Sequence, residues 1–458
     1  MSKGLIVLIA YAVVMLIATM KLTQRERNVE RFCVGNRNAN WLLSALSIAA
    51  TWIWAPSLFV STEKAYTGGF AGLFWFLVPN VLCLIFFIPF AQRIRQEMPE
   101  GLTLSGYMAE KYQSAGVQRI YLFQLASLSV LSTGVQLLAG GKILSTVTGL
   151  PFWELTVILA IIGYSYSQFS GIKASILTDS IQMVVMLAAC IGFVIFGLRS
   201  SGSGALVRGL EGFGGGFGSL FSVNGLEVFL GFGLPTAIGL ISGPFGDQSF
   251  WQRAFTVTER YIGRSFMVGA LLFGIVPLSM GILGFLGAGV GYQVQDLGVV
   301  NFEIISWLFP AWVTVPFLFM IISGLLSTVD SNLCAVSSLA TDVGVKNLQQ
   351  TKGAMVLLLM AGILIANIPG LTVTYLFLFY GTLRASTLLP TVLTLKGVRL
   401  DSRGITWGIC LSLAAGLPIF AYGTFLSSGV YKTIGSLITV LTSGVVALAI
   451  TRVHSPKN

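Results

Sequence analysis

The sequence predicts an all-α protein that crosses a membrane many times. Hydrophobic residues make up 55% and charged residues 10% of its 458 residues, and the mean hydropathy is +0.85. A soluble domain carries about 25% charged residues. Apolar runs of roughly 17–25 residues, the length of a membrane-spanning helix, recur from one end of the chain to the other. We therefore expect one membrane domain that covers residues 1–458.

Thirteen apolar runs are predicted to be transmembrane helices. The first lacks a basic flank before it and a small-residue cleavage site after it, so we interpret it as a retained span rather than a signal peptide. The runs within residues 41–395 form the predicted core, and two more lie within residues 404–451. The predicted spans are residues 4–20, 41–63, 70–91, 118–146, 152–170, 175–198, 226–250, 266–290, 310–340, 353–369, 371–395, 404–425 and 431–451. Residues 199–225, rich in glycine and serine, are predicted to be a flexible external loop.

The basic residues predict how the chain is oriented. With the N-terminus outside, twenty of the 27 Lys and Arg residues fall on the cytoplasmic side and five on the external side. This bias places the C-terminus in the cytoplasm, in a protein of the plasma membrane. Anionic lipid at the inner surface of the bilayer accounts for the net charge of +10, so no nucleic-acid partner is expected. Lys142 and Arg384 lie inside predicted spans and have no partner that the sequence identifies.

The second apolar run, residues 41–63, cannot be a regular helix throughout. Pro56 has no backbone N–H and crowds the carbonyl four residues before it, which breaks the hydrogen bonding near Trp52 and Ile53. In a membrane, the freed carbonyl groups are tolerated only where protein, water or an ion satisfies them. For this segment taken alone, a kinked helix repaired by its neighbours is the favoured interpretation.

A second interruption, Ser242–Gly246 (SGPFG), falls in a later apolar run. Counted from the second span, the two interruptions lie in core helices one and six. Interrupted helices at matching places in two halves of a chain are typical of inverted-repeat transporters, whose binding site lies near the middle of the membrane. The pairing of the two breaks therefore favours a transporter.

The ninth apolar run carries a polar face. Spacings of three and four place four residues on one helical side: Gly324, Ser327, Thr328 and Ser331. Together with Asp330, which borders this side, they form an all-oxygen surface of the kind that a hard cation needs. Backbone carbonyls of the broken helix, at Ala50 and Ile53, would complete a sodium site. The alternative, in which the hydroxyls bond to their own helix, explains the hydroxyls but not Asp330.

Other polar residues in the membrane have less certain roles. Asp179, at the inner end of the sixth run, fits equally a helix end near headgroup water and a partner in a cation site. Asp247 and Arg253, after the second interruption, are interpreted as a local structural pair. His454 is the one histidine of the sequence and the five cysteines are scattered, so we expect no enzyme, because no nucleophile–base set is present.

Four motifs resemble the sodium/solute symporter family, and the resemblance covers nearly the whole chain. They are RFCVGNR (residues 31–37), TLSGYMAEKY (Thr103–Tyr112), GIKASILTDSIQMVVM (Gly171–Met186) and SFWQR (Ser249–Arg253). The resemblance implies the leucine-transporter-type fold, with five plus five inverted core helices, one helix before the core and two after it. It also implies a sodium site made of the carbonyls of Ala50, Ile53 and Gly324 and the hydroxyls of Ser327 and Thr328.

Some members of this family, such as sialic acid transporters, have a second sodium site. The matching positions in this chain are Asp179, Ser327, Asp330 and Ser331. Because Asp330 stands where those members have a hydroxyl, the resemblance implies either a second cation or a proton there and leaves the stoichiometry open.

The resemblance also implies where the solute binds. The positions that match the substrate contacts of the family are Trp52, Trp54, Ser57, Phe76, Gln136, Leu240 and Ser242. Two tryptophans and a phenylalanine suit a compact planar or cationic solute better than a hexose. The tryptophan pair and the sequence Asp247-Gln248 most resemble the urea-type branch. The alternative for each tryptophan is a position that faces lipid.

We therefore expect a sodium-coupled symporter that imports a small polar solute, such as a urea-like compound, an amine or an amino acid, by alternating access. Proton coupling through Asp330 or Asp179 is one alternative. A membrane module that senses a solute without net transport is another, although the short tail RVHSPKN (residues 452–458) disfavours an output domain.

Overall fold

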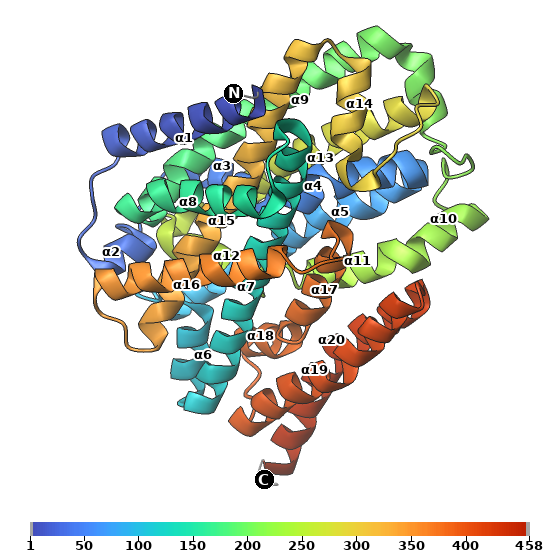
Figure 1. Ribbon diagram of the computed structural model, residues 1–458. Helices are drawn as coiled ribbons and strands as arrows, with labels where there is room; N and C mark the ends of the chain where they lie inside the picture. Colours follow the sequence, from blue (N-terminus) through green and yellow to red (C-terminus); the bar gives the residue numbers. More distant parts are fainter. Residues whose placement is uncertain (1–2, 455–458) are drawn as a thin grey trace.

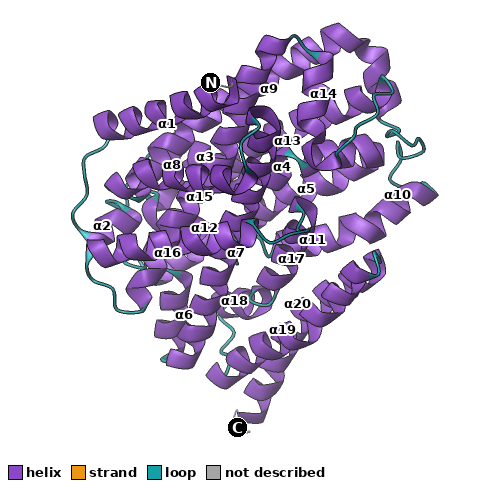
Figure 2. Ribbon diagram, in the orientation of Figure 1, coloured by secondary structure: helices purple, strands orange, loops and turns teal. Residues whose placement is uncertain are grey.

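The computed structural model describes residues 3–454, and within them the backbone is almost entirely helical (Figures 1 and 2). The β-structure in this part of the chain is a single parallel bridge between Ala39 and Val257. The first two and last four residues, and with them the termini whose sides of the membrane are predicted above, lie outside the described residues.

Twenty α-helices and four short helical turns follow one another within residues 3–454. They are α1 (Lys3–Leu22), α2 (Val29–Val34), α3 (Trp41–Trp52), α4 (Ala55–Leu58), α5 (Val60–Glu97), α6 (Leu104–Tyr112), α7 (Ala115–Thr148), α8 (Phe152–Ser170), α9 (Ile172–Gly209), α10 (Val223–Val228), η1 (Phe229–Gly233), α11 (Leu234–Ile241), α12 (Gln248–Thr256), η2 (Glu259–Tyr261), α13 (Ile262–Gly289), η3 (Leu297–Val299), α14 (Val300–Leu308), η4 (Ala311–Val313), α15 (Thr314–Asp342), α16 (Leu348–Ala366), α17 (Val373–Ala385), α18 (Leu388–Leu395), α19 (Ser402–Phe425) and α20 (Gly429–His454). In Figure 1, α1 and the pair α19–α20 lie on opposite sides of the bundle, with α3, α4 and α15 between them.

Ten of the described helices are long and apolar enough to cross a membrane, or eleven if the bent pair α17–α18 counts as one span. The predicted number of thirteen is not confirmed by this criterion. The interrupted helix α3 is too short to pass it. The helix α5 covers part of one predicted span and all of the next, because the backbone leaves helical geometry only at Gly69 (φ 53°, ψ −146°).

The first predicted interruption is present. Helix α3 ends at Trp52, Ile53 and Trp54 have non-helical backbone angles, and α4 starts at Ala55. Pro56 lies in the first turn of α4, where its missing N–H costs nothing because the first amides of a helix have no partner within it. Proline therefore ends one helix and starts the next in the middle of the bundle.

The second predicted interruption is present as well. Helix α11 ends at Ile241 and α12 starts at Gln248, with turns between them. Asp247 caps α12, since its carboxylate accepts a hydrogen bond from the Ser249 N–H at 2.9 Å. The same cap corrects one prediction: Asp247 serves its own helix and forms no ion pair with Arg253, whose carboxylate partner is Asp179.

The predicted flexible loop over residues 199–225 is wrong in its first part. Helix α9 continues to Gly209, and only Gly202 (φ 77°) departs from helical angles. The rest of the segment is hydrogen-bonded to α5 just after Gly69, because the N–H groups of Phe70 and Ala71 donate to the carbonyls of Leu210 and Phe217 at 2.8 and 3.1 Å. Glycine here permits a bend and a close approach between backbones.

Candidate functional site

Backbone oxygens of the first break meet a hydroxyl of α15. The Thr328 Oγ1 lies 3.3 Å from the Thr51 carbonyl oxygen, 3.5 Å from that of Ile53 and 3.4 Å from that of Gly324. One hydroxyl proton can satisfy only one of these three acceptors, and all three distances exceed those of an ordinary hydroxyl hydrogen bond. The arrangement leaves several oxygen lone pairs directed at one buried place.

Gly324 allows the two elements to come this close. A side chain at position 324 would place its first carbon 2.8 Å from Leu58 Cδ1 and 3.2 Å from Ile53 Cγ2. The absence of that carbon lets α15 pack directly against the broken segment.

The residues predicted for the sodium site are only partly brought together. Ile53, Gly324 and Thr328 converge as described. The Ala50 carbonyl instead accepts a hydrogen bond from the Ile53 N–H at 3.1 Å, and the Ser327 hydroxyl donates to Asp179 Oδ1 at 2.6 Å. The carbonyl of Thr51 takes part and was not predicted; its position just before the break is the signal that could have identified it.

Asp179 is the centre of a buried hydrogen-bonded ion pair. Its Oδ2 accepts from Ser47 Oγ at 2.6 Å and from Arg253 Nη2 at 2.8 Å, and both charged side chains are 0% exposed. The same Arg253 nitrogen donates to Ser331 Oγ at 2.8 Å. A guanidinium group therefore lies among residues predicted to hold a second cation, and it connects α3, α9, α12 and α15.

Asp330 interacts electrostatically with Asp179 but takes no part in its ion pair. Its Oδ2 accepts a hydrogen bond from Thr178 Oγ1 at 3.2 Å, and the Cys334 thiol is 4.0 Å from its Oδ1. No basic side chain among the described residues forms an ion pair with it. Asp330 and Asp179 thus lie in one buried region but have different hydrogen-bond partners.

The predicted aromatic residues gather beside the first break. The rings of Trp52 and Trp54 are stacked with their centroids 6.5 Å apart, and Trp54 lies 5.4 Å from Phe377 and 5.3 Å from Tyr380 of α17. Phe76 of α5 is 5.9 Å from Phe377. The three predicted aromatics are buried within the protein and do not face lipid.

The other predicted substrate residues hold the breaks in place. The Gln136 Oε1 accepts the N–H of Ala55 at 2.7 Å, and its Nε2 donates to the Ser132 carbonyl at 3.1 Å. The hydroxyl of Ser242 donates to the Gly239 carbonyl at 2.7 Å, and that of Ser57 to the Trp52 carbonyl at 3.4 Å. Leu240 is fully buried near the second break. In this conformation these polar side chains are bonded to backbone.

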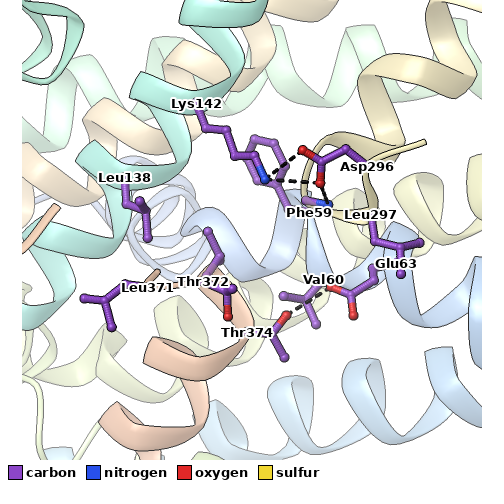
Figure 3. Close-up of a pocket in the computed structure, with 12 residues that line it drawn as sticks. Phe59, Val60, Glu63, Leu138, Lys142, Asp296, Leu297, Leu371, Thr372 and Thr374 are labelled. Atoms are coloured by element: carbon purple, nitrogen blue, oxygen red, sulfur yellow. Dashed lines mark hydrogen bonds and ion pairs between the residues drawn. The ribbon is translucent and has the colours of Figure 1, made fainter. Parts of the chain in front are cut away.

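A cavity of about 330 Å³ opens next to the start of α17 (Figure 3). It is lined by Phe59 and Val60 after the first break and by residues 371–374. Lys142 of α7 forms an ion pair with Asp296 at 2.9 Å across one side, and Thr374 donates to Glu63 at 3.0 Å on the other (Figure 3). We refer to this cavity as the vestibule; by the predicted orientation, it opens to the outside.

Comparison with known proteins gives a consistent result. The model of the family described as "Sodium:solute symporter family" matches residues 32–411. A sodium/pantothenate symporter of Escherichia coli is 24% identical, with 90% of each chain covered. A urea-proton symporter of rice, Oryza sativa subsp. japonica, is 22% identical over 86% of this chain. This chain spans only 42 to 68% of the length of the first urea transporters that it matches.

The fold is that of known transporters. The solved structure of a Na⁺-coupled sialic acid symporter in a substrate-bound outward-open state has a TM-score of 0.77 to this chain, with 16% sequence identity and 98% of each chain covered. This likeness confirms the predicted leucine-transporter-type fold.

Proposed function

The chain belongs to the sodium:solute symporter family, and we propose on that basis that it carries a small polar solute across the plasma membrane together with sodium. One observation supports sodium most directly: the carbonyls of Thr51, Ile53 and Gly324 and the hydroxyl of Thr328 converge at the first helix break. Neutral oxygen ligands at a break in a membrane helix are suited to a hard monovalent ion.

The position of these oxygens suggests how sodium is coupled to transport. Two of the carbonyls belong to the broken helix and one to α15, so a cation bound to all of them holds the two elements together. If the broken helix and α15 separate in another conformation, a bound cation stabilises the conformation in which they are in contact. An ion that bound both conformations equally would not shift the equilibrium between them. The aromatic residues next to the break form the proposed solute-binding site.

Asp330 supports a second candidate, proton coupling. Its carboxyl group is buried without a basic partner among the described residues. A buried carboxyl group of this kind can take up and release a proton. Asp179 is less suited, because Arg253 already neutralises it. The relatives include both a sodium-coupled and a proton-coupled symporter, so each ion has a precedent within the family.

Uptake into proteoliposomes distinguishes the two ions. We expect an inward sodium gradient at constant pH to drive accumulation of [14C]urea or [14C]pantothenate, the solutes named for the relatives, and replacement of sodium by choline to abolish it. Accumulation driven by a pH gradient without sodium, and lost in Asp330→Asn, would instead establish proton coupling.

A further inference from the structure

Arg384 of α17 is a buried cation whose terminal nitrogens have no partner. Its side chain is 1% exposed, its Nε donates a hydrogen bond to the Gly239 carbonyl at 2.7 Å, and the Tyr380 side chain interacts with its guanidinium group. Neither Nη1 nor Nη2 has a hydrogen-bond partner in the part of the chain that the structure describes. Buried guanidinium groups are otherwise paired or hydrogen-bonded, because an unpaired buried charge is costly.

The guanidinium lies against the proposed solute site. Its central carbon is 4.9 Å from the ring centroid of Tyr380 and 5.6 Å from that of Trp52. Gly246 in the second break makes room for it, since a side-chain carbon at position 246 would be 2.5 Å from Arg384 Cβ. Arg384 therefore lies where the two helix breaks and α17 meet.

Its surroundings do not neutralise it. Asp247 is the acidic side chain that interacts with it electrostatically, but the two form no ion pair, and Asp247 caps α12 through Ser249. The aromatic faces of Trp52 and Tyr380 attract a cation, and the Tyr380 hydroxyl interacts with the guanidinium, but neither Nη1 nor Nη2 makes a hydrogen bond of ordinary geometry within the described residues. Two N–H-bearing nitrogens thus remain available at this point.

A third unpartnered donor belongs to another residue that contacts Tyr380. The indole Nε1 of Trp54 is buried and makes no hydrogen bond within the described residues. Trp54 and Arg384 contact the same ring, since both lie about 5 Å from Tyr380, at 5.3 and 4.9 Å. Buried donors without an acceptor, on residues that share one aromatic neighbour, are complementary to an oxygen of a ligand.

We propose that Arg384, with the Trp54 indole, binds a planar oxygen acceptor of the solute, either the carboxylate of a small organic acid or the carbonyl of a urea-type amide. This proposal rests on the proposed transport function and narrows its substrate. A guanidinium presents two parallel donors that match such a group. It repels a cationic solute, so the amines allowed by the aromatic residues alone are excluded.

Equilibrium binding to the full chain in lipid nanodiscs tests the proposal. The probes are [14C]acetate, [14C]urea and [14C]methylammonium, each with saturating sodium. We expect acetate or urea to bind and methylammonium not to bind. Arg384→Lys, which keeps the charge but loses the paired donors, should raise the Kd at least ten-fold, and Trp54→Phe, which loses only the N–H and part of the ring, several-fold.

A matched variant and a second measurement separate this proposal from others. Arg264→Lys alters another arginine that stacks on a tryptophan, 3.7 Å from the ring of Trp41, and should leave the Kd unchanged. Sodium should raise the melting temperature of Arg384→Lys as much as that of the unaltered protein, which shows that the variant is folded and binds the ion.

Each result of these measurements supports or contradicts a specific part of the proposal. Binding of acetate identifies the carboxylate source, and binding of urea the neutral carbonyl. Tight binding of methylammonium, no binding of either oxygen probe, or a Kd within two-fold of the original in Arg384→Lys overturns the role of Arg384. If sodium does not raise the melting temperature of the unaltered protein, that result contradicts the proposed function instead.

Discussion

At the scale of single residues, the hydroxyl of Thr328 is the side-chain group on which the sodium proposal depends most. Thr328→Val removes the oxygen and keeps the volume, so we expect the sodium concentration needed for half-maximal uptake to rise at least ten-fold. Thr328→Ser, which keeps the hydroxyl, should stay close to the original protein. Sodium-dependent uptake in proteoliposomes measures both variants.

A control lies further along the same helix. The Thr341 hydroxyl donates to the Ser338 carbonyl at 2.7 Å, a bond within its own helix. Thr341→Val should leave the sodium dependence unchanged. Equal effects of the two valine variants would mean that any lost hydroxyl on α15 disturbs transport, and the assignment of Thr328 to the ion would fail.

The sequence predicted some of the oxygens that converge at the first break and missed others, for a physical reason. Ile53, Gly324 and Thr328 were identified because a proline break and a helical spacing are local patterns. Ser327 has the same spacing, but its hydroxyl turned to Asp179. A hydroxyl can bond to any of several nearby acceptors, and segments distant in the sequence decide which one it meets. This cannot be predicted from the local pattern of a single sequence. Arg384 had no apparent partner in the sequence for a similar reason.

At the scale of helices, Gln136 stabilises the break between α3 and α4. Its amide oxygen is the acceptor for the Ala55 N–H, an amide that no turn of helix satisfies. In Gln136→Leu this buried donor loses its partner, so we expect a loss of about 1–3 kcal/mol in stability. Thermal unfolding in detergent measures it. Gln113→Leu, at an exposed position, is the control, and equal melting temperatures of both variants would contradict this role.

The ion pair of Arg253 and Asp179, with its hydrogen bonds to Ser47 and Ser331, connects four helices. Its loss should therefore weaken the packing of all four. Removing one partner leaves a buried charge unpaired, which costs about 3–5 kcal/mol. We therefore expect Arg253→Gln and Asp179→Asn to be strongly destabilised singly and the double variant to recover much of the loss. Melting temperatures of the four proteins form the cycle that measures it. Additive losses would show that the pair is not coupled.

Some helix ends can be predicted from the sequence and others cannot. Both interruptions were predicted because proline and glycine act on their own backbone. The end of α9 was not, since glycine permits a loop and a helix alike, and the outcome depends on contacts with α13, such as the hydrogen bond from Arg208 Nε to the Gly289 carbonyl at 3.0 Å. The number of spans is difficult to predict for a related reason: α5 continues through Gly69, and only this residue has non-helical backbone angles.

At the scale of the whole molecule, the vestibule provides a test of both orientation and access. If the N-terminus is outside, a cysteine at Leu371 in the vestibule should react with a membrane-impermeant thiol reagent in intact cells. A cysteine at Gln349, an exposed residue at the start of α16, should react only after the cells are permeabilised. Cys410, which is partly exposed, is first changed to serine, and the other cysteines are buried. The reverse pattern would invert the proposed orientation.

The ion pair of Lys142 and Asp296 lies across one side of the vestibule, so we expect it to limit access. Partial burial acts to raise the pKa of Asp296, but the hydrogen bonds from Lys142 and the Gly298 N–H outweigh it and hold the pKa below its usual range. A lowered pKa keeps the carboxylate charged at neutral pH, and the pair is lost only as the pH falls through that lowered value. Relative to a fully exposed reference cysteine, which corrects for the change in thiolate fraction, labelling of Leu371→Cys should therefore change little between about pH 5 and about pH 8.

Breaking the pair by mutation should have a measurable but limited effect. Both side chains are more than two fifths exposed, at 43% and 48%, and an exposed pair contributes at most about 1 kcal/mol. Asp296→Asn should therefore speed labelling of Leu371→Cys by no more than about five-fold, and high salt should reduce the difference because it screens the pair. A much larger increase would mean that Asp296 controls the opening of the bundle itself. An unchanged rate in low salt would show that the pair spans the vestibule without restricting it, and access would then depend on the packing of the aromatic side chains below.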